Sequence, residues 1–429
     1  MFGFSDCLPR KKVSACCLGM ASVAALALSA LAADTAADAV LAKLHAELTR
    51  DVSDLRGVAC MESVERTRYA PRRSDPSATC GELITAANEA QRGAKEWHSR
   101  LRLDVTAGSD AENFALADAS RFEGSDIGGM LHAADAGSGE FSTFLRNLVN
   151  GDGAPLQSRG VQQTPIGPLL SFGFSAPEDK SHFVYASASP EAPSAPIRTG
   201  YHGSLFIVPQ SGDLKRLTLV AENAGDACRV QYSTDYTATR VGDREIIVPQ
   251  SSAMDVIYRN GTELQSETYY SGCRRTGGNT ATPAAVSGAP KPLPAGVRFK
   301  VRFQPPIDSA TAATGDPVVG VIRTTVKDKQ NGVIVHTGDR VHGRISLIEE
   351  YPGPQPTWNL AIVIETIERG VGEHGIDQGV EQPVSLAPLD DAATTPTKLK
   401  LRPPGGGYFI FHDQTFALDQ RYETGWETR

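Results

Sequence analysis

Successive hairpin signals are the feature that most constrains the fold of this chain. Between residues 204 and 270, apolar and polar residues alternate in stretches separated by short turns, among them Gly242-Asp243 and Asn260-Gly261. Alternation with a period of two is typical of half-buried strands, and Asn-Gly between two such stretches is a strong hairpin signal. Because consecutive hairpins place each strand beside the next, the sequence predicts one broad antiparallel sheet.

Further strands are expected on the N-terminal side of these hairpins. Alternation predicts strands over 60–69 and 97–105, and the apolar stretches 169–174 and 182–185 flank a turn at 177–179. The strands of the later hairpins are expected at 204–208, 214–220, 229–241, 245–259 and 263–270.

Two amphipathic helices accompany these strands. The first is predicted from a cap at Asp34 or Thr35 to Gly57. Its apolar face comprises Val40, Leu41, Leu44, Leu48 and Val52. The second follows Ser138 and ends at Asn150-Gly151. Its apolar face comprises Phe141, Phe144, Leu145 and Leu148.

A change of composition divides the chain after residue 275. Residues 276–292 are Thr, Gly, Ala, Ser and Pro with almost no large apolar side chain, which is typical of a linker. Alternation then resumes without helical periodicity, so a second, small all-β domain is predicted over 293–429. Its strands are expected at 297–303, 317–326, 332–336, 340–348, 358–367 and 408–416, with loops at 369–383 and 388–398.

The N-terminus carries an export signal. A basic patch, Arg10-Lys11-Lys12, precedes an apolar stretch that ends in Ala30-Leu31-Ala32, the pattern of a signal-peptidase site. Residues 1–32 are therefore predicted to be a cleaved signal peptide, and an uncleaved anchor is the alternative. The mature protein is expected in the periplasm or outer cell envelope, with no transmembrane span after cleavage.

The cysteines fit an oxidising compartment. The chain has 7 Cys, and the predicted signal peptide contains Cys7, Cys16 and Cys17. The four that remain are Cys60, Cys80, Cys228 and Cys273. An even number in an exported protein predicts two disulfides. All three connectivities stay open, and Cys60–Cys80 is the most local pair.

Signals for catalysis or cofactor binding are weak. The chain has no Gly-x-Ser-x-Gly, His-Glu-x-x-His or Gly-x4-Gly-Lys motif, so no catalytic residue, cofactor or metal site is predicted. His336, Asp339 and His342 form a metal-like trio without supporting context. A formal net charge of -8 argues against nucleic acid as a partner, because phosphate binding needs a basic patch.

The hairpin from Ser204 to Leu217, with Pro209-Gln210-Ser211-Gly212 at its turn, resembles the strand–Pro–x–x–Gly–x–strand hairpin of the LolA/LolB/RseB envelope proteins. The order of signal peptide, capped helix and strand is also similar, and the resemblance covers about residues 33–275. It implies a mainly β (α+β) domain, an open antiparallel β-barrel or curved sheet with helices on its concave face. It also implies an apolar cavity there for a lipid chain or an acylated partner. The cysteines and the Pro-rich insert at 189–196 depart from the simple carriers.

The apolar side chains expected to line such a cavity come from both helices and from the sheet. They are Leu44, Leu48, Trp97, Leu101, Phe141, Phe144, Leu148, Phe172, Phe174, Leu205 and Ile207. Plain core packing is the alternative explanation, because a helix against a sheet buries such residues with or without a ligand.

The start of the C-terminal domain resembles a small β-barrel module of TrbI-type conjugation proteins. The similar features are Leu293-Pro294-Ala295-Gly296, Thr314-Gly315-Asp316 and Thr337-Gly338-Asp339. This resemblance implies a structural or assembly role and no catalytic residue.

Together these patterns predict a non-enzymatic envelope protein that binds a lipid, an acyl chain or an acylated partner. An interaction or assembly protein that docks a protein partner through its β domains is the alternative. A secreted hydrolase whose site leaves no motif is a third hypothesis, which buried carboxyls or a histidine with shifted pKa values in one cleft would favour.

Overall fold

The computed structural model describes residues 41–428 except 73–76, 90–91, 110, 118–121, 123, 126–138, 151, 153–155, 186–195, 277–292, 329–331, 370–379, 384–385, 389–406 and 419–421. The predicted signal peptide, nearly all of the predicted linker and nearly all of the Pro-rich insert lie outside these residues. So does all but the first residue of the loop expected at 388–398.

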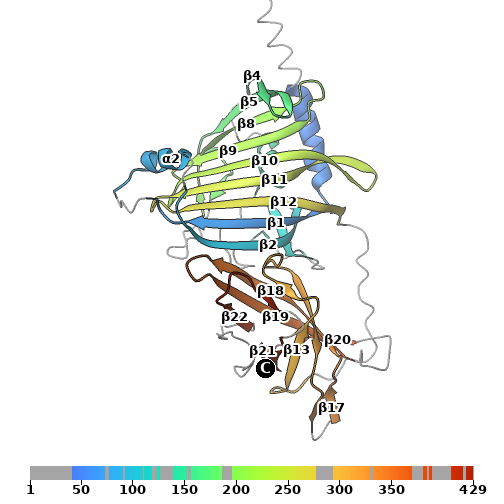
Figure 1. Ribbon diagram of the computed structural model, residues 1–429. Helices are drawn as coiled ribbons and strands as arrows, with labels where there is room; N and C mark the ends of the chain where they lie inside the picture. The colour runs from blue at the N-terminus through green and yellow to red at the C-terminus, as the bar shows by residue number, and fades with distance from the viewer. Residues whose placement is uncertain are drawn as a thin grey trace, which may run out of the picture.

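The N-terminal region, defined here as residues 41–275, is dominated by ten antiparallel strands (Figure 1). Pairing runs β4-β5-β8-β9-β10-β11-β12-β1-β2-β3, and in the described residues the sheet does not close into a barrel. In this order the strands are β4 (Gln157–Thr164), β5 (Gly167–Ala176), β8 (Tyr201–Ile207), β9 (Leu214–Glu222), β10 (Ala227–Val241), β11 (Arg244–Tyr258), β12 (Glu263–Arg275), β1 (Val58–Tyr69), β2 (Lys95–Ala107) and β3 (Glu112–Leu116). The prediction of a broad antiparallel sheet is confirmed.

The predicted turns join the central strands. Gly242 (φ 66°) joins β10 to β11, and Gly261 (φ 81°) joins β11 to β12. A positive φ suits glycine because it has no Cβ to clash with the backbone. The side chains of these strands alternate between buried and less buried positions, and we call the face with the buried positions the buried face.

One expected pairing is wrong. Residues 182–185 were expected to follow β5 across a turn, but β6 (Val184–Tyr185) pairs with β7 (Ile197–Arg198) in a separate two-stranded sheet. The partner of β5 on that side is β8. Short apolar stretches carry no information about which strand they pair with, so only the tertiary structure decides this.

Three helices are described in the N-terminal region. The described part of the first covers residues 41–55, buries Leu44 and Leu48, and is followed by Gly57 at φ 75°, as expected. Its predicted cap at Asp34 or Thr35 and Val40 of its predicted apolar face lie outside the described residues. It is the long blue helix of Figure 1. The second predicted helix is α4 (Thr143–Asn150). Helix α2 (Cys80–Asn88) was not expected, although Thr79 and Glu82 form a capping box at its start.

The C-terminal region, residues 293–428, consists of strands throughout its described part. They are β13 (Arg298–Phe303), β14 (Ile307–Asp308), β15 (Pro317–Ile322), β16 (Val326–Asp328), β17 (Gly332–Val335), β18 (Arg340–Tyr351), β19 (Thr357–Arg369), β20 (Val380–Pro383), β21 (Leu386–Pro388), β22 (Gly407–Phe411), β23 (Ala417–Leu418) and β24 (Thr424–Thr428). The stretch 317–326 holds two strands, and the expected loop at 369–383 contains β20. Strand β24 was also missed; it pairs with β13 and brings the end of the chain back to the start of the region.

The two regions meet along β2 and β18. Ser99 and His98 pair with Glu349 and Glu350, which joins both sets of strands into one hydrogen-bonded sheet. The Arg102 amide donates to the Thr314 carbonyl (2.8 Å), and the Thr314 amide donates to the Arg100 carbonyl (2.9 Å).

Charged side chains reinforce this junction. Arg100 Nη1 donates to the Ser309 carbonyl (2.7 Å), and Arg102 pairs with Asp316. Burial, together with Lys95, Arg100 and Arg66, lowers the pKa of His98 at the same place to about 4.

Buried apolar side chains form three clusters. Cluster 1 lies on the buried face around Leu205, Ile207 and Tyr232, and cluster 3 lies around Leu55, Val58 and Leu103. Cluster 2 contains only residues of the C-terminal region, with Trp426 at 0% exposure.

Candidate functional site

Most of the predicted cavity residues belong to one cluster. Cluster 1 contains Leu44, Leu48, Phe144, Phe172, Phe174, Leu205 and Ile207, and Leu148 and Trp97 pack against it. Leu101 and Phe141 belong instead to cluster 3. Residues of helix 41–55, of α4 and of the strands thus share cluster 1, but the predicted set is divided between two clusters.

Trp97 has a more specific neighbour. The guanidinium of Arg66 lies 4.9 Å from the centre of its ring, within the range of a cation–π contact. Arg66 also donates to Ser99 Oγ from Nε (3.1 Å) and from Nη2 (2.7 Å). The indole is thus held by a buried polar group of the sheet.

Aromatic rings form the centre of cluster 1. The Phe144 ring lies 5.0 Å from Tyr232 and 6.0 Å from Phe183, and the Phe183 ring lies 6.0 Å from Tyr201. Phe174 stands edge-on to Tyr201 at 6.1 Å. Sequence reasoning missed Phe183, Tyr201 and Tyr232, although Tyr232 stands at an inward position of a strand whose alternation was recognised.

Polar groups border this aromatic centre. The Tyr201 hydroxyl donates to Asp152 Oδ2 (3.2 Å), the same carboxylate accepts the His182 amide (3.0 Å), and Asp152 Oδ1 contacts His182 Nδ1. Burial, with the Asp152 charge beside it, raises the pKa of Tyr201. In the described part of the chain, no hydrogen bond joins His182 to a serine, threonine or cysteine side chain.

Three glutamates lie inside the fold. Glu62 of β1, Glu112 of β3 and Glu140 just before α4 are each 3% exposed. Glu112 accepts amide hydrogens from Gly139 (2.7 Å), Ser142 (2.8 Å) and Thr143 (3.3 Å), which fixes the start of α4. We call Glu62, Glu112 and Glu140 the acid cluster.

Two tyrosines border the acid cluster. Tyr270 is the cross-strand neighbour of Glu62, and its ring lies 5.9 Å from that of Phe141. The Tyr236 hydroxyl donates to the Glu140 carbonyl at 3.4 Å. The acid cluster therefore lies where cluster 1, which contains Tyr236, approaches cluster 3, which contains Phe141.

Burial changes the proton affinity of all three carboxyls. Desolvation, followed by repulsion from Glu112, raises the pKa of Glu140 to about 8. Desolvation and the charges of Glu140 and Glu112 hold the pKa of Glu62 well above its ordinary value. Desolvation also raises the pKa of Glu112, although its backbone hydrogen bonds act in the opposite direction. These shifts match one criterion of the hydrolase hypothesis, but the carboxyls lie in the interior and not along an open cleft.

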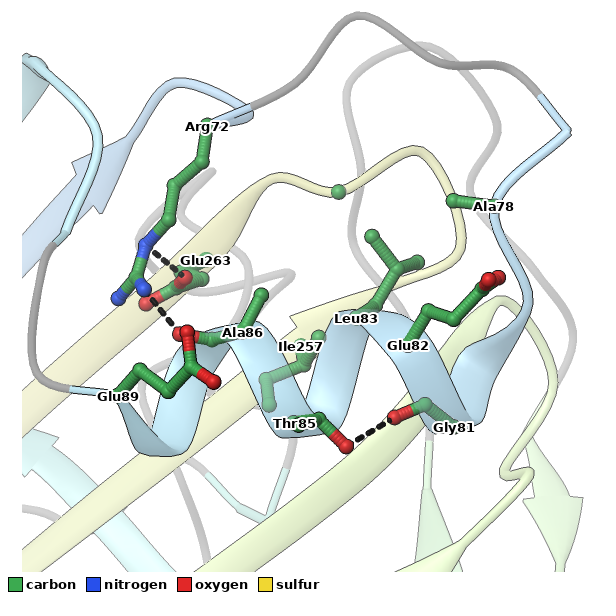
Figure 2. Close-up of a pocket in the computed structure, with 11 residues that line it drawn as sticks. Arg72, Ala78, Gly81, Glu82, Leu83, Thr85, Ala86, Glu89, Ile257 and Glu263 are labelled. Carbon is green, nitrogen blue, oxygen red and sulfur yellow. Dashed lines mark hydrogen bonds and ion pairs between the residues drawn. The ribbon is translucent and has the colours of Figure 1, made fainter.

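A separate pocket of about 680 Å³ lies beside α2 (Figure 2). Leu83 and Ala86 of α2 line it together with Ile257 of β11, Glu263 of β12 and Gly261 at the hairpin tip. Arg72 crosses the pocket, pairs with Glu263 (3.5 Å from Nε to Oε1) and donates to the Ala86 carbonyl. Arg72 therefore links α2 to strand β12 through the Ala86 carbonyl and Glu263.

The cysteines form two disulfides, as expected. Cys60 bonds to Cys273, which links β1 to β12, and Cys80 bonds to Cys228, which links α2 to β10. Of the three connectivities left open by the sequence, the one with the most local pair, Cys60–Cys80, does not form. Strand β1 carries Cys60 and pairs with β12, which carries Cys273. This pairing decides the connectivity.

The metal-like trio does not assemble. Asp339 accepts the His336 amide (2.8 Å), whereas His342 Nε2 lies 3.3 Å from Glu368 Oε2 on the neighbouring strand. Among the described residues, no group of three or more His, Cys, Asp or Glu side chains is arranged to hold a metal ion.

Comparison of the chain with protein-family models, with curated proteins and with solved structures finds no match. Within the described residues, no helix has the length and apolar character needed to cross a membrane. The two disulfides are compatible with export to an oxidising compartment.

Proposed function

We propose that the protein is a non-enzymatic binding protein of the cell envelope that holds a lipid or acyl chain against the buried face of its sheet. The observation that carries this proposal is cluster 1, in which helix 41–55, α4 and strands β5 to β11 contribute to one aromatic and aliphatic layer. Pocket linings for apolar ligands have this composition. The sheet is open, so its face can be exposed by moving a helix without breaking a closed ring of strands.

Helix 41–55 acts as the cover of this face. The helix buries Leu44 and Leu48 in cluster 1, where Leu41 and Val52 are partly buried; Asp51 and Leu55 are also buried, and Leu55 belongs to cluster 3. The remaining contacts include Lys43 and Glu47, which lie against the turn at Gly212. An acyl chain competes with these few leucines for the same apolar surface, and it gains about 0.8 kcal/mol for each methylene that it buries.

The test is binding of cis-parinaric acid, a fluorescent fatty acid, to the purified protein. Leu48→Ala removes part of the cover and leaves space beside the sheet, so the Kd is expected to fall about tenfold, equivalent to about 1.4 kcal/mol. Leu360→Ala is the matched control, because Leu360 is a leucine with 0% exposure in cluster 2. An unchanged Kd in Leu48→Ala, or an equal change in both variants, contradicts the proposal.

An assembly role through a sheet edge is the second candidate, and strand β4 favours it. In the described residues β4 pairs only with β5; Val161 is 56% exposed, and Ile166 at the adjoining turn is 72% exposed. An exposed edge offers its free amides and carbonyls to an extended strand of a partner protein. A photocrosslinker at Gln162 should then capture that partner in the envelope, whereas one at Lys215 on an internal strand should not.

A further inference from the structure

Among the described residues, the acid cluster has no positively charged partner. The described side chains whose charges act on Glu62 are Glu140 and Glu112, and the one that acts on Glu140 is Glu112. Tyr236 and Tyr270, the titratable groups that face the cluster from β10 and β12, are neutral donors. Buried carboxyls are normally paired with a cation or fully hydrogen-bonded, because an unpaired buried charge is costly.

Two polar atoms in this place have no partner. Glu62 Oε2 and Ser142 Oγ are both buried without a hydrogen bond in the described structure, and their residues are 3% and 2% exposed. Glu112 differs from Glu62, since backbone amides of the segment before α4 occupy its oxygens. The unsatisfied hydrogen-bonding capacity therefore lies on Glu62 and Ser142, while Glu140 adds a second buried carboxyl beside them.

The cluster is also adjacent to the proposed acyl site. Glu140 lies four residues before Phe144, which is at the centre of the aromatic layer, and Tyr236 belongs both to that layer and to the wall of the acid cluster. An acyl chain that lies along cluster 1 would therefore have one end at the acid cluster. Movement of the segment 139–150 opens both places at once, because that segment carries Glu140, Ser142 and α4.

We propose, on the basis of the proposed acyl-binding function, that the ligand is a cationic amphiphile whose ammonium group binds between Glu62, Glu140 and Ser142 while its chain lies in cluster 1. An ammonium group has three donors, which matches the two carboxyls and the hydroxyl. A metal ion does not suit the cluster, because the described residues hold no three-ligand arrangement. Charge-assisted hydrogen bonds in a buried site are stronger than neutral ones.

Binding in this way is linked to proton release. Burial, with repulsion from neighbouring glutamates, raises the pKa of Glu140 to about 8 and holds the pKa of Glu62 well above its ordinary value, so both carboxyls hold a proton more tightly than an exposed glutamate does. The ammonium group favours the charged carboxylate and lowers these pKa values on binding. Glu112, Tyr236 and Tyr270 remain beside the site, and none of them supplies a positive charge.

The experiment compares dodecylamine with dodecan-1-ol at pH 7 by isothermal titration calorimetry in buffers of different ionisation enthalpy. Dodecylamine is expected to bind at least about tenfold more tightly than the alcohol and to release protons. Glu62→Gln and Glu140→Gln should each remove this preference and the proton release, while the Kd for dodecan-1-ol stays the same. Glu222→Gln, a change of an exposed carboxylate on β9, is the matched control.

The outcomes separate the two proposals. Equal binding of dodecylamine and dodecan-1-ol, or a preference for dodecylamine that persists in both glutamine variants, contradicts the proposal of a cationic ligand. Either result is still compatible with the proposed acyl site. Failure of every 12-carbon probe to bind overturns the acyl site itself. Glutamine is isosteric with a protonated glutamate, so the variants are expected to fold, and a circular-dichroism melt checks this.

Discussion

The N-terminal and C-terminal regions differ in what they bury. Cluster 2 of the C-terminal region is built from Val, Ile, Leu, Phe, Ala and Trp, and no cysteine follows Cys273. The region buries one described carboxylate, Asp339, which accepts the His336 amide. The N-terminal region has two disulfides and a cluster of buried glutamates. All described carboxyls with a raised pKa, including Glu62 and Glu140, lie in this region.

This difference indicates that the buried carboxyls lower the stability of the N-terminal region. An apolar core needs no further support, since its burial alone stabilises the fold. Buried carboxyls oppose folding, and disulfides offset that cost by restricting the unfolded chain. The region that carries the destabilising groups is also the one in which we propose a ligand site.

The largest change in stability is expected from removal of the Cys60–Cys273 disulfide. This bond spans a sequence separation of 213 residues. In a Cys60→Ser, Cys273→Ser variant the N-terminal region should lose about 4 kcal/mol of unfolding free energy. Fluorescence melts can separate the regions, because Trp97 reports on one, and Trp358 and Trp426 report on the other.

The matched control for that variant is removal of the Cys80–Cys228 bond. Helix α2 has no buried residue, so it regains freedom in the folded state when the bond is lost, and the loss of stability should be smaller. An equal shift of the Trp358 and Trp426 transition in the first variant would show that the two regions do not unfold separately.

A smaller effect, of opposite sign, is expected from Glu140→Gln. The pKa of Glu140 is raised from 4.5 to about 8, so its penalty is absent at low pH and grows as the pH rises through this window. The variant should match the wild type at pH 4.5 and be about 2 kcal/mol more stable at pH 9. Chemical unfolding at both pH values measures this; a difference that does not depend on pH would contradict the buried, protonated state of Glu140.

The smallest effect is expected at the junction of the regions. Arg102→Ala removes the pair with Asp316 and should weaken docking by about 1 kcal/mol. Exchange of the Thr314 amide, which bonds to the Arg100 carbonyl, should then accelerate about fivefold. Arg216→Ala removes an Arg–Asp pair within the N-terminal region and should leave that amide unchanged.

Local signals predicted much of the fold. Residue patterns and turn residues act over a few positions, so they predict local structure. Examples are the turn at Asn260-Gly261, the helix that ends before Gly57 and the alternation of β1 and β2. Helix α2 was not predicted because its sequence has no apolar periodicity. The capping box at Thr79 and Glu82 is a local signal that could have predicted its start. Strand β24 was missed because its partner β13 lies more than 100 residues earlier in the chain.

The candidate site was predictable only in part. The apolar members of cluster 1 follow from strand and helix periodicity, because burial of one face requires them. The acid cluster does not, because Glu62, Glu112 and Glu140 come from three separate elements and each looks like an ordinary charged residue in its own stretch of sequence. Their proximity depends on the pairing of β1 with β2 and of β2 with β3, and on the hydrogen bond from the Gly139 amide to Glu112, which places Glu140.

The sequence by itself determined the mainly β architecture, the positions of the hairpins and the number of disulfides, since these depend on alternation, turn residues and cysteine count. Only the tertiary structure decided that Cys60 bonds to Cys273, that β2 pairs with β18, and that three glutamates share one buried place. The physical reason is that long-range pairing depends on which surfaces fit together after the strands have formed, and no local pattern records that choice.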